Sequence, residues 1–137
     1  MSTVAIVGAG YMGSALAWPL SDRGHQVRLV GTPLDREIIQ TCLKDGRHPK
    51  LQRALPAGVR PYPIEALDDA LAGADLVVQG VSSPGVEWFA EAVGPHLDPG
   101  RPLLSITKGL ALADDGLPCI LPDLLDQRLP GPLRGRL

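Results

Sequence analysis

The 137-residue sequence has little net charge, few cysteines and no long hydrophobic run. Its formal net charge is −2, so no bulk electrostatic attraction to nucleic acid or to anionic membranes is expected. Cys42 and Cys119 belong to no pair motif, which argues against a disulfide framework and a zinc site. No apolar run approaches the roughly 20 residues that cross a bilayer, and the N-terminus lacks the pattern of a signal peptide. These absences predict a cytoplasmic protein without a membrane or nucleic-acid partner.

The charges that are present are unevenly placed. Residues 36–60 contain six lysines or arginines and two acids, whereas residues 61–100 contain seven acids and no lysine or arginine. The two stretches are either two solvated faces or, for the basic one, a wall near a polyanionic ligand. The second interpretation requires a ligand site nearby.

Short apolar runs alternate with segments of helical periodicity along the chain. Expected strands cover residues 3–7, 26–30, 59–62, 75–81 and 102–106. Expected helices begin after Gly10, at about Leu34, at Ile64 and after Ser83, with Pro84 at its first position. Pro19 predicts a kink or an early end in the first helix, and Gly24 its stop. This alternation predicts an open, twisted parallel sheet of five or six strands with helices on both faces.

The strongest motif is the G-x-G-x-x-G segment at residues 8–13, which follows a buried strand and opens a helix. Gly8 permits a tight turn, Gly10 lets the backbone approach a pyrophosphate, and Gly13 lets the helix pack close to the strand. Free amides and the helix dipole then bind the diphosphate. In this context the motif predicts a doubly wound Rossmann domain that binds NAD or NADP.

A second feature concerns the ribose end of the cofactor. The second strand ends in Val30-Gly31-Thr32 rather than in an acid, and Asp35 lies later. A 2′-phosphate would therefore not be repelled there, and Thr32 and Arg36 are candidates to contact it. We expect NADP or dual use, with a solvated Arg36 as the alternative.

Two further candidates end later strands on the ligand-binding edge. Ser83 is expected to cap its helix and to line the cofactor crevice, or only to cap. Lys108, between a strand end and Gly109, is a candidate to bind an anionic or carbonyl substrate through its compact charge. Exposed solvated lysine is the alternative for Lys108.

The order of these motifs resembles that of NAD(P)-dependent glycerol-3-phosphate dehydrogenases over residues 2 to about 112. Gly8–Ala17 is similar to the family's G-A-G-x-W-G-T-A-L-A, His48-Pro49-Lys50 to its N-P-K, and Val81-Ser82-Ser83 to its V-P-S. The S-x-T-K-G segment is present without change at Ser105–Gly109. Met12 replaces the family's tryptophan and Ser82 its proline.

The resemblance implies an activity and a division of the chain. It implies hydride transfer between NAD(P)H and dihydroxyacetone phosphate, with the backbone at Tyr11 and Met12 and the residue Thr32 on the dinucleotide, and Lys108 beside nicotinamide and substrate. Residues 1–112 would form the Rossmann domain. Residues 113–137 would be a Pro- and Leu-rich tail leading toward an absent helical domain that carries the catalytic acid/base group.

Two alternatives and one consequence accompany that interpretation. A ketopantoate-type or hydroxyacid reductase is one alternative, and a non-catalytic nucleotide-binding fragment is the other. The tail, with Leu117, Ile120, Leu121, Leu124 and Leu125, is expected to cover an apolar surface that the missing domain would bury, so self-association of the chain is expected.

Overall fold

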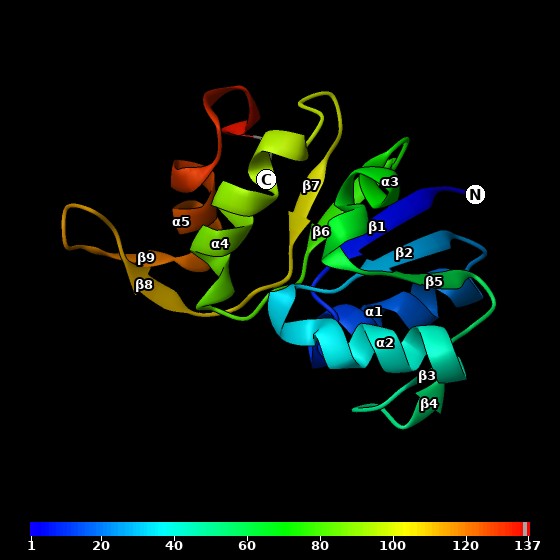
Figure 1. The fold of residues 1–137 in the computed structure, drawn as a ribbon. Coiled ribbons are helices and arrows are strands. Elements are labelled where there is room, and N and C mark those ends of the chain that lie inside the picture. Colours follow the sequence, from blue (N-terminus) through cyan, green and yellow to red (C-terminus); the bar gives the residue numbers. More distant parts are fainter. Residues whose placement is uncertain (136) are drawn as a thin grey trace.

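The computed structural model describes residues 1–135 and 137, and its centre is a sheet of five parallel strands (Figure 1). The strand order is β5-β2-β1-β6-β7. The strands are β1 (Thr3–Val7), β2 (Gln26–Val30), β5 (Val59–Tyr62), β6 (Leu76–Gln79) and β7 (Leu103–Ser105). The order therefore reverses between β1 and β6, as in a doubly wound sheet, and the predicted fold class is confirmed.

The strands form where apolar, β-branched residues cluster. In β1, Val4 to Val7 are buried, and Val4 pairs with Val27 of β2 on one side and with Leu76 of β6 on the other. A strand buried on both faces is apolar at successive positions, which explains the lack of alternation. β5 is the outer strand next to β2 and contains Pro61, as expected for an edge.

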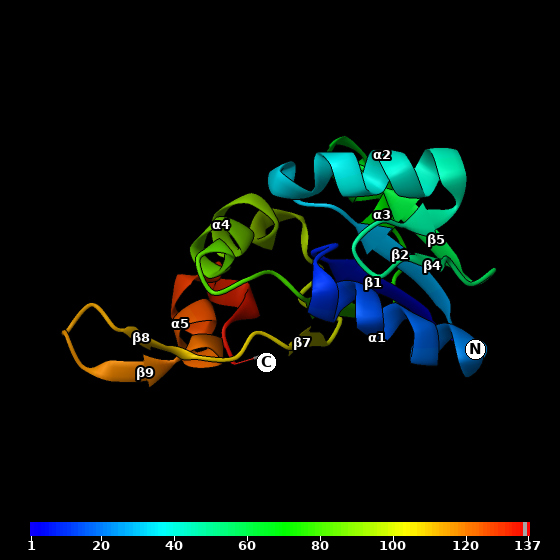
Figure 2. The same cartoon turned by 90° about the horizontal axis from the view of Figure 1, so that it is seen from below.

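Helices cover both faces of the sheet. They are α1 (Tyr11–Asp22), α2 (Arg36–Asp45), α3 (Leu67–Leu71), α4 (Gly85–Ala92) and α5 (Leu121–Arg128). Short 3-10 turns occupy Pro33–Asp35, Ile64–Ala66, Gly94–His96 and Gly131–Leu133. Side chains of α1 and α2 share one hydrophobic cluster, and those of α3, α4 and α5 share the other. Figure 2 views the molecule from the side of α1 and α2.

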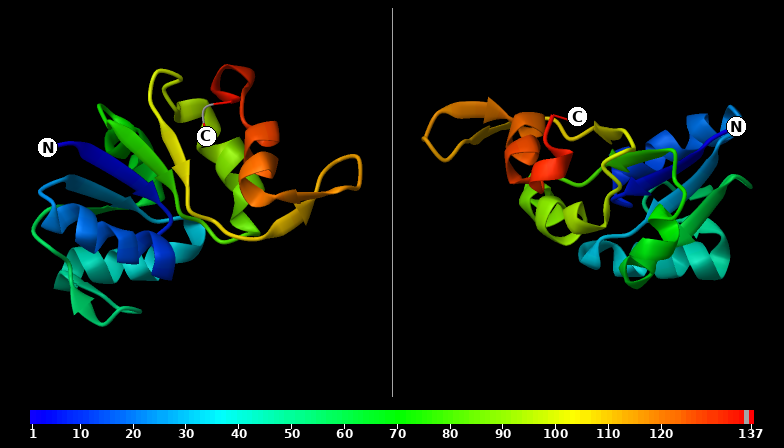
Figure 3. Two further views of the ribbon diagram at one scale, coloured as in Figure 1. Left: turned by 180° about the vertical axis from the view of Figure 1, so that it is seen from behind. Right: turned by 90° about the horizontal axis from the view of Figure 1, so that it is seen from above.

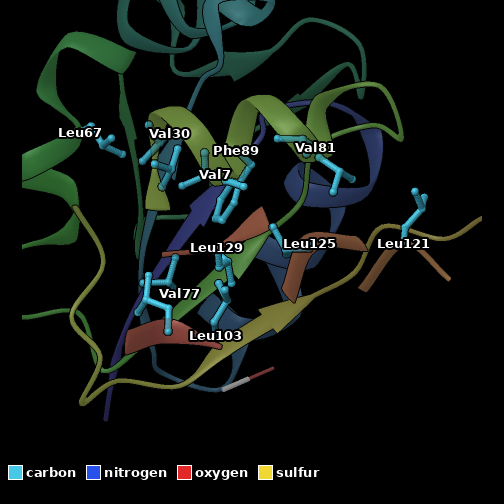
Figure 4. Close-up of a cluster of buried hydrophobic side chains, with 14 of the residues drawn as sticks. Val7, Val30, Leu67, Val77, Val81, Phe89, Leu103, Leu121, Leu125 and Leu129 are labelled. Carbon is cyan, nitrogen blue, oxygen red and sulfur yellow. The ribbon is translucent and has the colours of Figure 1, made fainter. Parts of the chain in front are cut away.

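The larger cluster lies between the sheet and the pair α4–α5 (Figure 4). Phe89 of α4 is fully buried, and Leu125 of α5 packs into the same cluster with Val77 and Leu103 of the sheet. Leu121 and Leu124 are also buried there, whereas Leu117 and Ile120 are exposed. The leucine-rich segment after residue 112 thus covers α4 and the sheet with part of its apolar side chains.

Two antiparallel pairs lie outside the main sheet. β3 (Arg47–His48) pairs with β4 (Arg53–Ala54) in the basic connection, for which the sequence predicted no element. β8 (Leu110–Leu112) pairs with β9 (Pro118–Ile120), and this hairpin projects from the rest of the molecule in every view (Figures 1–3). Among residues 1–135 and 137, no helix is long and apolar enough to cross a membrane.

The expected stop of the first helix at Gly24 is confirmed, but an early end at Pro19 is not seen. α1 continues past Pro19 to Asp22, and the Arg23 amide donates to the Pro19 carbonyl before Gly24 turns the chain with a φ of 83°. The expected cap of α4 is wrong. Ser83 does not cap α4. The helix begins at Gly85 after Pro84, with no side-chain capping bond, because Ser83 and Pro84 form a turn in which the Gly85 amide donates to the Ser82 carbonyl.

Candidate functional site

A cleft with a volume of about 490 Å³ opens at the carboxyl ends of β1, β2 and β6, where the strand order reverses. Ligands of open α/β sheets bind at this position. Its walls are the glycine turn, residues 32–35 after β2, residues 80–82 after β6, the start of α4 with Trp88, and Lys50. Another cavity, of about 230 Å³, lies near the amino ends of β6 and β7, beside Asp68, His96 and Arg101 and away from the glycine turn.

The three glycines of the motif differ in what surrounds them. Gly8 has a φ of 118°, and a Cβ there would lie 2.5 Å from the Gly80 carbonyl oxygen of β6's end. A Cβ at Gly13 would overlap the Gly8 carbonyl oxygen, so α1 packs directly on the turn. A Cβ at Gly10 would meet nothing within 4 Å. Gly8 and Gly13 therefore hold the turn together, while Gly10 leaves open space in the cleft.

The N-terminus of α1 presents free backbone donors beside that open space. The first intrahelical bond is donated by the Ser14 amide to the Gly10 carbonyl at 3.1 Å, so the amides of Tyr11, Met12 and Gly13 have no acceptor within the helix. The side chains of Tyr11 and Met12 are exposed. Unpaired amides and the positive end of the helix dipole together favour an anion here.

An acid does lie at the end of β2 in space, which corrects the expectation that the strand end lacks one. The 3-10 turn after Thr32 brings Asp35 back, and its Oδ2 accepts from the Ala9 amide at 3.1 Å and from the Thr32 amide and hydroxyl at 2.9 Å each. Asp35 is buried yet lines the cleft. The local signal was the T-x-x-D spacing, a capping box that folds an acid back onto the residue before the helix.

Thr32 and Arg36 are less free than the sequence suggested. The Thr32 hydroxyl donates to Asp35 and accepts from the Leu34 amide, although Thr32 still lines the cleft. Arg36 does not line it and forms an exposed ion pair, 2.5 Å long, with Glu65. A hydrogen bond with its own backbone and the bond from Arg36 lower the pKa of Glu65.

One residue of the basic stretch reaches the cleft. Lys50, in the turn between β3 and β4, lines it, and its Nζ lies 5.6 Å from the centre of the Tyr11 ring. Arg53 instead lies over Trp18, and Arg47 donates to the Gln52 carbonyl. The interpretation of the basic stretch as a wall near an anion therefore rests on Lys50.

The ends of β6 and β7 are joined through polar side chains. Ser83 Oγ donates to the Lys108 carbonyl at 3.4 Å, and Thr107 Oγ1 donates to the Val81 carbonyl at 2.6 Å. Ser105 Oγ donates to Oε1 of the buried Gln79 at 2.7 Å. Lys108 is exposed on this edge but is not part of the cleft wall, which Ser82 rather than Ser83 lines.

The sequence did not single out the side chains of Trp88 and His48. Trp88 of α4 is half-buried, packing against the core cluster of Val86 and Phe89 while also lining the cleft. His48 is fully buried beneath the glycine turn, within hydrogen-bond distance of Ser14 and Ala9. No periodicity marks it.

Comparison with known proteins agrees with this geometry. Residues 3–131 match the family described as NAD-dependent glycerol-3-phosphate dehydrogenase N-terminus. The NADP(+)-dependent glycerol-3-phosphate dehydrogenase of Archaeoglobus fulgidus is 39% identical over 114 residues, which cover 83% of this chain and 33% of that protein. The chain spans about a third of the length of the curated relatives it matches.

Solved structures share the fold. The glycerol-3-phosphate dehydrogenase of Coxiella burnetii has a TM-score of 0.78 at 24% identity, covering 93% of this chain and 38% of that one. A ketopantoate reductase of Ralstonia eutropha has a TM-score of 0.61 at 28% identity, covering 78% and 34%. Since the family match extends over nearly the whole chain, this chain belongs to the family of NAD-dependent glycerol-3-phosphate dehydrogenase N-terminal domains.

Proposed function

We propose that this chain forms the NAD(P)-binding half of a glycerol-3-phosphate dehydrogenase, which transfers hydride reversibly between NAD(P)H and dihydroxyacetone phosphate to give sn-glycerol 3-phosphate. The observation that carries the proposal is the open Gly10 position at the N-terminus of α1. A diphosphate needs bare backbone there, and a side chain would occupy its place. The family match supports the choice of substrate.

Different residues of the chain bind the diphosphate and polarise the substrate. The amides of Tyr11, Met12 and Gly13 receive the diphosphate, and Lys50, beside the Tyr11 ring, adds a positive charge. The nicotinamide, when bound, supplies or accepts the hydride. Lys108 places its ammonium beside the substrate carbonyl and polarises it, while Ser83 holds the Lys108 backbone. No residue of this chain is assigned as the proton donor.

The preferred cofactor is proposed to be NADP, with NAD also accepted. The NADP(+)-dependent relative from Archaeoglobus fulgidus supports this choice. Arg36 supplies the charge for a 2′-phosphate, because its partner Glu65 is exposed and exposed ion pairs are weak enough to exchange. Thr32 lines the cleft beside the ribose, but its hydroxyl is not available to the cofactor, since it is bonded to Asp35.

Tryptophan fluorescence tests the cofactor site, because Trp88 lines the cleft and Trp18 does not. Saturable quenching by NADH and NADPH is expected, stronger in Trp18→Phe, which keeps only Trp88, than in Trp88→Phe. Gly10→Ala is expected to leave thermal stability unchanged, because its Cβ meets open space at an ordinary φ of −72°, and to weaken binding at least about tenfold. Absence of binding by the unmodified chain, or normal binding by Gly10→Ala, would refute the site.

A second candidate substrate follows from the likeness to the ketopantoate reductase, which shares the fold at 28% identity. Steady-state kinetics of the protein encoded by the longest reading frame that carries these residues separates the two. Dihydroxyacetone phosphate is expected to be reduced with the higher kcat/KM. Turnover of ketopantoate or another small oxoacid, without turnover of dihydroxyacetone phosphate, would replace the first proposal. A small phosphorylated substrate and a cytoplasmic location remain predictions.

A further inference from the structure

Ala9, in the middle of the glycine turn, is held from two sides. It is fully buried, its amide donates to Asp35 Oδ2 at 3.1 Å, and its carbonyl oxygen lies 3.0 Å from His48 Nε2. The two partners come from different parts of the chain, the turn after β2 and the hairpin β3–β4. The single non-glycine residue between Gly8 and Gly10 therefore has both of its backbone polar groups bound by buried side chains.

The contacts of His48 identify the position of its proton. The Leu51 amide lies 3.2 Å from His48 Nδ1, and an amide only donates, so Nδ1 is the acceptor. The Ala9 carbonyl only accepts, so Nε2 carries the hydrogen and donates to it. Ser14 Oγ, at the start of α1, lies 2.9 Å from the same Nε2. The ring is thus neutral, and both of its nitrogens are used.

These contacts bear on where the backbone donors point. Gly8, before Ala9, has a positive φ, and Gly10, after it, has open space at its Cβ position. Because glycine has no side chain, neither residue can restrain the turn through side-chain contacts. A turn that binds an anion through backbone amides gains affinity when the amides are already oriented before binding. His48 also begins the turn that carries Lys50 to the cleft wall.

We propose that His48 is a positioning residue for the diphosphate-binding turn, acting as a neutral Nε2–H donor to the Ala9 carbonyl opposite Asp35. It does not line the cleft, so it acts through Ala9 and the start of α1 rather than by touching the cofactor. The inference rests on the proposed cofactor site and adds to it the element that orients its amides. It also explains why His48 is fully buried, since a buried polar side chain is expected to have hydrogen-bond partners.

The test compares two replacements of His48, one with a polar group at the place of Nε2 and one with a polar group at the place of Nδ1. In His48→Gln the side-chain amide nitrogen reaches the place of Nε2 and preserves the donor to Ala9, whereas in His48→Asn it reaches only the place of Nδ1. We expect His48→Asn to weaken NADH binding about tenfold, roughly the value of one buried hydrogen bond, and His48→Gln to stay within about threefold. His25→Asn, at the far end of α1, is the matched control and should bind NADH normally.

Two readouts that do not need NADH accompany the titrations. In the unmodified chain, nitrogen chemical shifts of the imidazole should show a protonated Nε2 and an unprotonated Nδ1. The Ala9 amide should exchange slowly with solvent in the unmodified chain and in His48→Gln, and faster in His48→Asn. Thermal unfolding of each variant establishes that the affinities are compared between folded proteins.

The outcomes separate the inference from the function on which it rests. If the unmodified chain binds NADH and His48→Asn binds equally well, or His48→Gln is as weak as His48→Asn, the positioning role is wrong and the cofactor site stands. A protonated Nδ1 in the unmodified chain would likewise overturn the role. If the unmodified chain does not bind NADH, the proposed cofactor site fails and takes the positioning role with it.

Discussion

At the scale of single residues, an acid that lines the cleft and the arginine that follows it in sequence serve different purposes. Asp35 is buried and its Oδ2 is bonded to the backbone around it, so the carboxylate is part of the turn. Arg36, the next residue, is exposed and paired with Glu65. Of these two neighbours in sequence, one builds the site, and the other is a surface residue whose exposed ion pair is weak enough to exchange for a ligand.

Arg36→Gln tests whether that arginine recognises a 2′-phosphate. The variant should bind NADPH about tenfold more weakly and NADH unchanged, because a charge-assisted contact to phosphate is worth about 1.5–3 kcal/mol at most and only NADPH carries that phosphate. Titration with both nucleotides measures the ratio. An equal loss for the two nucleotides, or none, would remove Arg36 from the site. Glu65→Gln is the control, since it frees Arg36 without removing its charge.

At the scale of elements, α5 belongs to the core. Leu125 is fully buried against α4 and the sheet, whereas Leu117, in the loop before β9, is 63% exposed. Leu125→Ala should lower the free energy of unfolding by about 2–5 kcal/mol because it empties a packed position. Leu117→Ala should change it by less than about 0.5 kcal/mol. Urea unfolding of both variants checks this, and similar values for the two would mean that α5 is not docked.

The β8–β9 hairpin is tied to α5 by an ion pair. Arg128 donates to both carboxylate oxygens of Asp114 at 2.7 and 2.8 Å, which lowers the pKa of Asp114. Because the folded pKa is lowered, the pair stabilises the fold above the ordinary aspartate range, and that contribution is lost as the pH falls through the lower folded value. Both groups are at the surface, so the effect on stability is small.

Carbon-detected NMR titration of the Asp114 carboxyl measures this shift. Arg128→Gln should return the pKa of Asp114 to its ordinary range, because the hydrogen bonds and charge that lower it are removed. Arg134→Gln is the control, since Arg134 donates to the Leu129 carbonyl rather than to Asp114. An unchanged titration in Arg128→Gln would show that the ion pair does not form in solution.

At the scale of the whole molecule, several exposed apolar side chains lie on the projecting hairpin β8–β9. Leu110, Leu112 and Leu117 are 74%, 68% and 63% exposed. We expect the chain to self-associate through them, since a protruding apolar surface gains by burial. Sedimentation velocity over a range of concentrations should show a rising mass for the unmodified chain and less association for Leu110→Ser with Leu112→Ser. A monomer at every concentration would contradict the expectation.

The fold was predictable because the features that specify it are local. Five apolar runs and a glycine motif indicated the parallel sheet and the position of the cleft. His48 was not assigned because its partner is the carbonyl of Ala9, which is far away in sequence and has no pattern of its own. Asp35 had a local signal, the capping box with Thr32, but its bond to the Ala9 amide is equally distant in sequence. Ser83 was misassigned because Ser-Pro is typical both of a helix start and of a turn, and the chain uses the turn.

The proline in β5 has a consequence for how these molecules meet one another. Along the outer side of that strand, backbone amides point away from β2 at alternate residues. The Val59 amide is already donated to the Pro56 carbonyl at 2.9 Å, and Pro61, two residues on, has no amide hydrogen. Within β5, the free edge therefore offers no donor to a passing strand. This edge of the sheet therefore disfavours the edge-to-edge strand pairing that starts β-aggregates, through its backbone as well as through the exposed charge of Arg60.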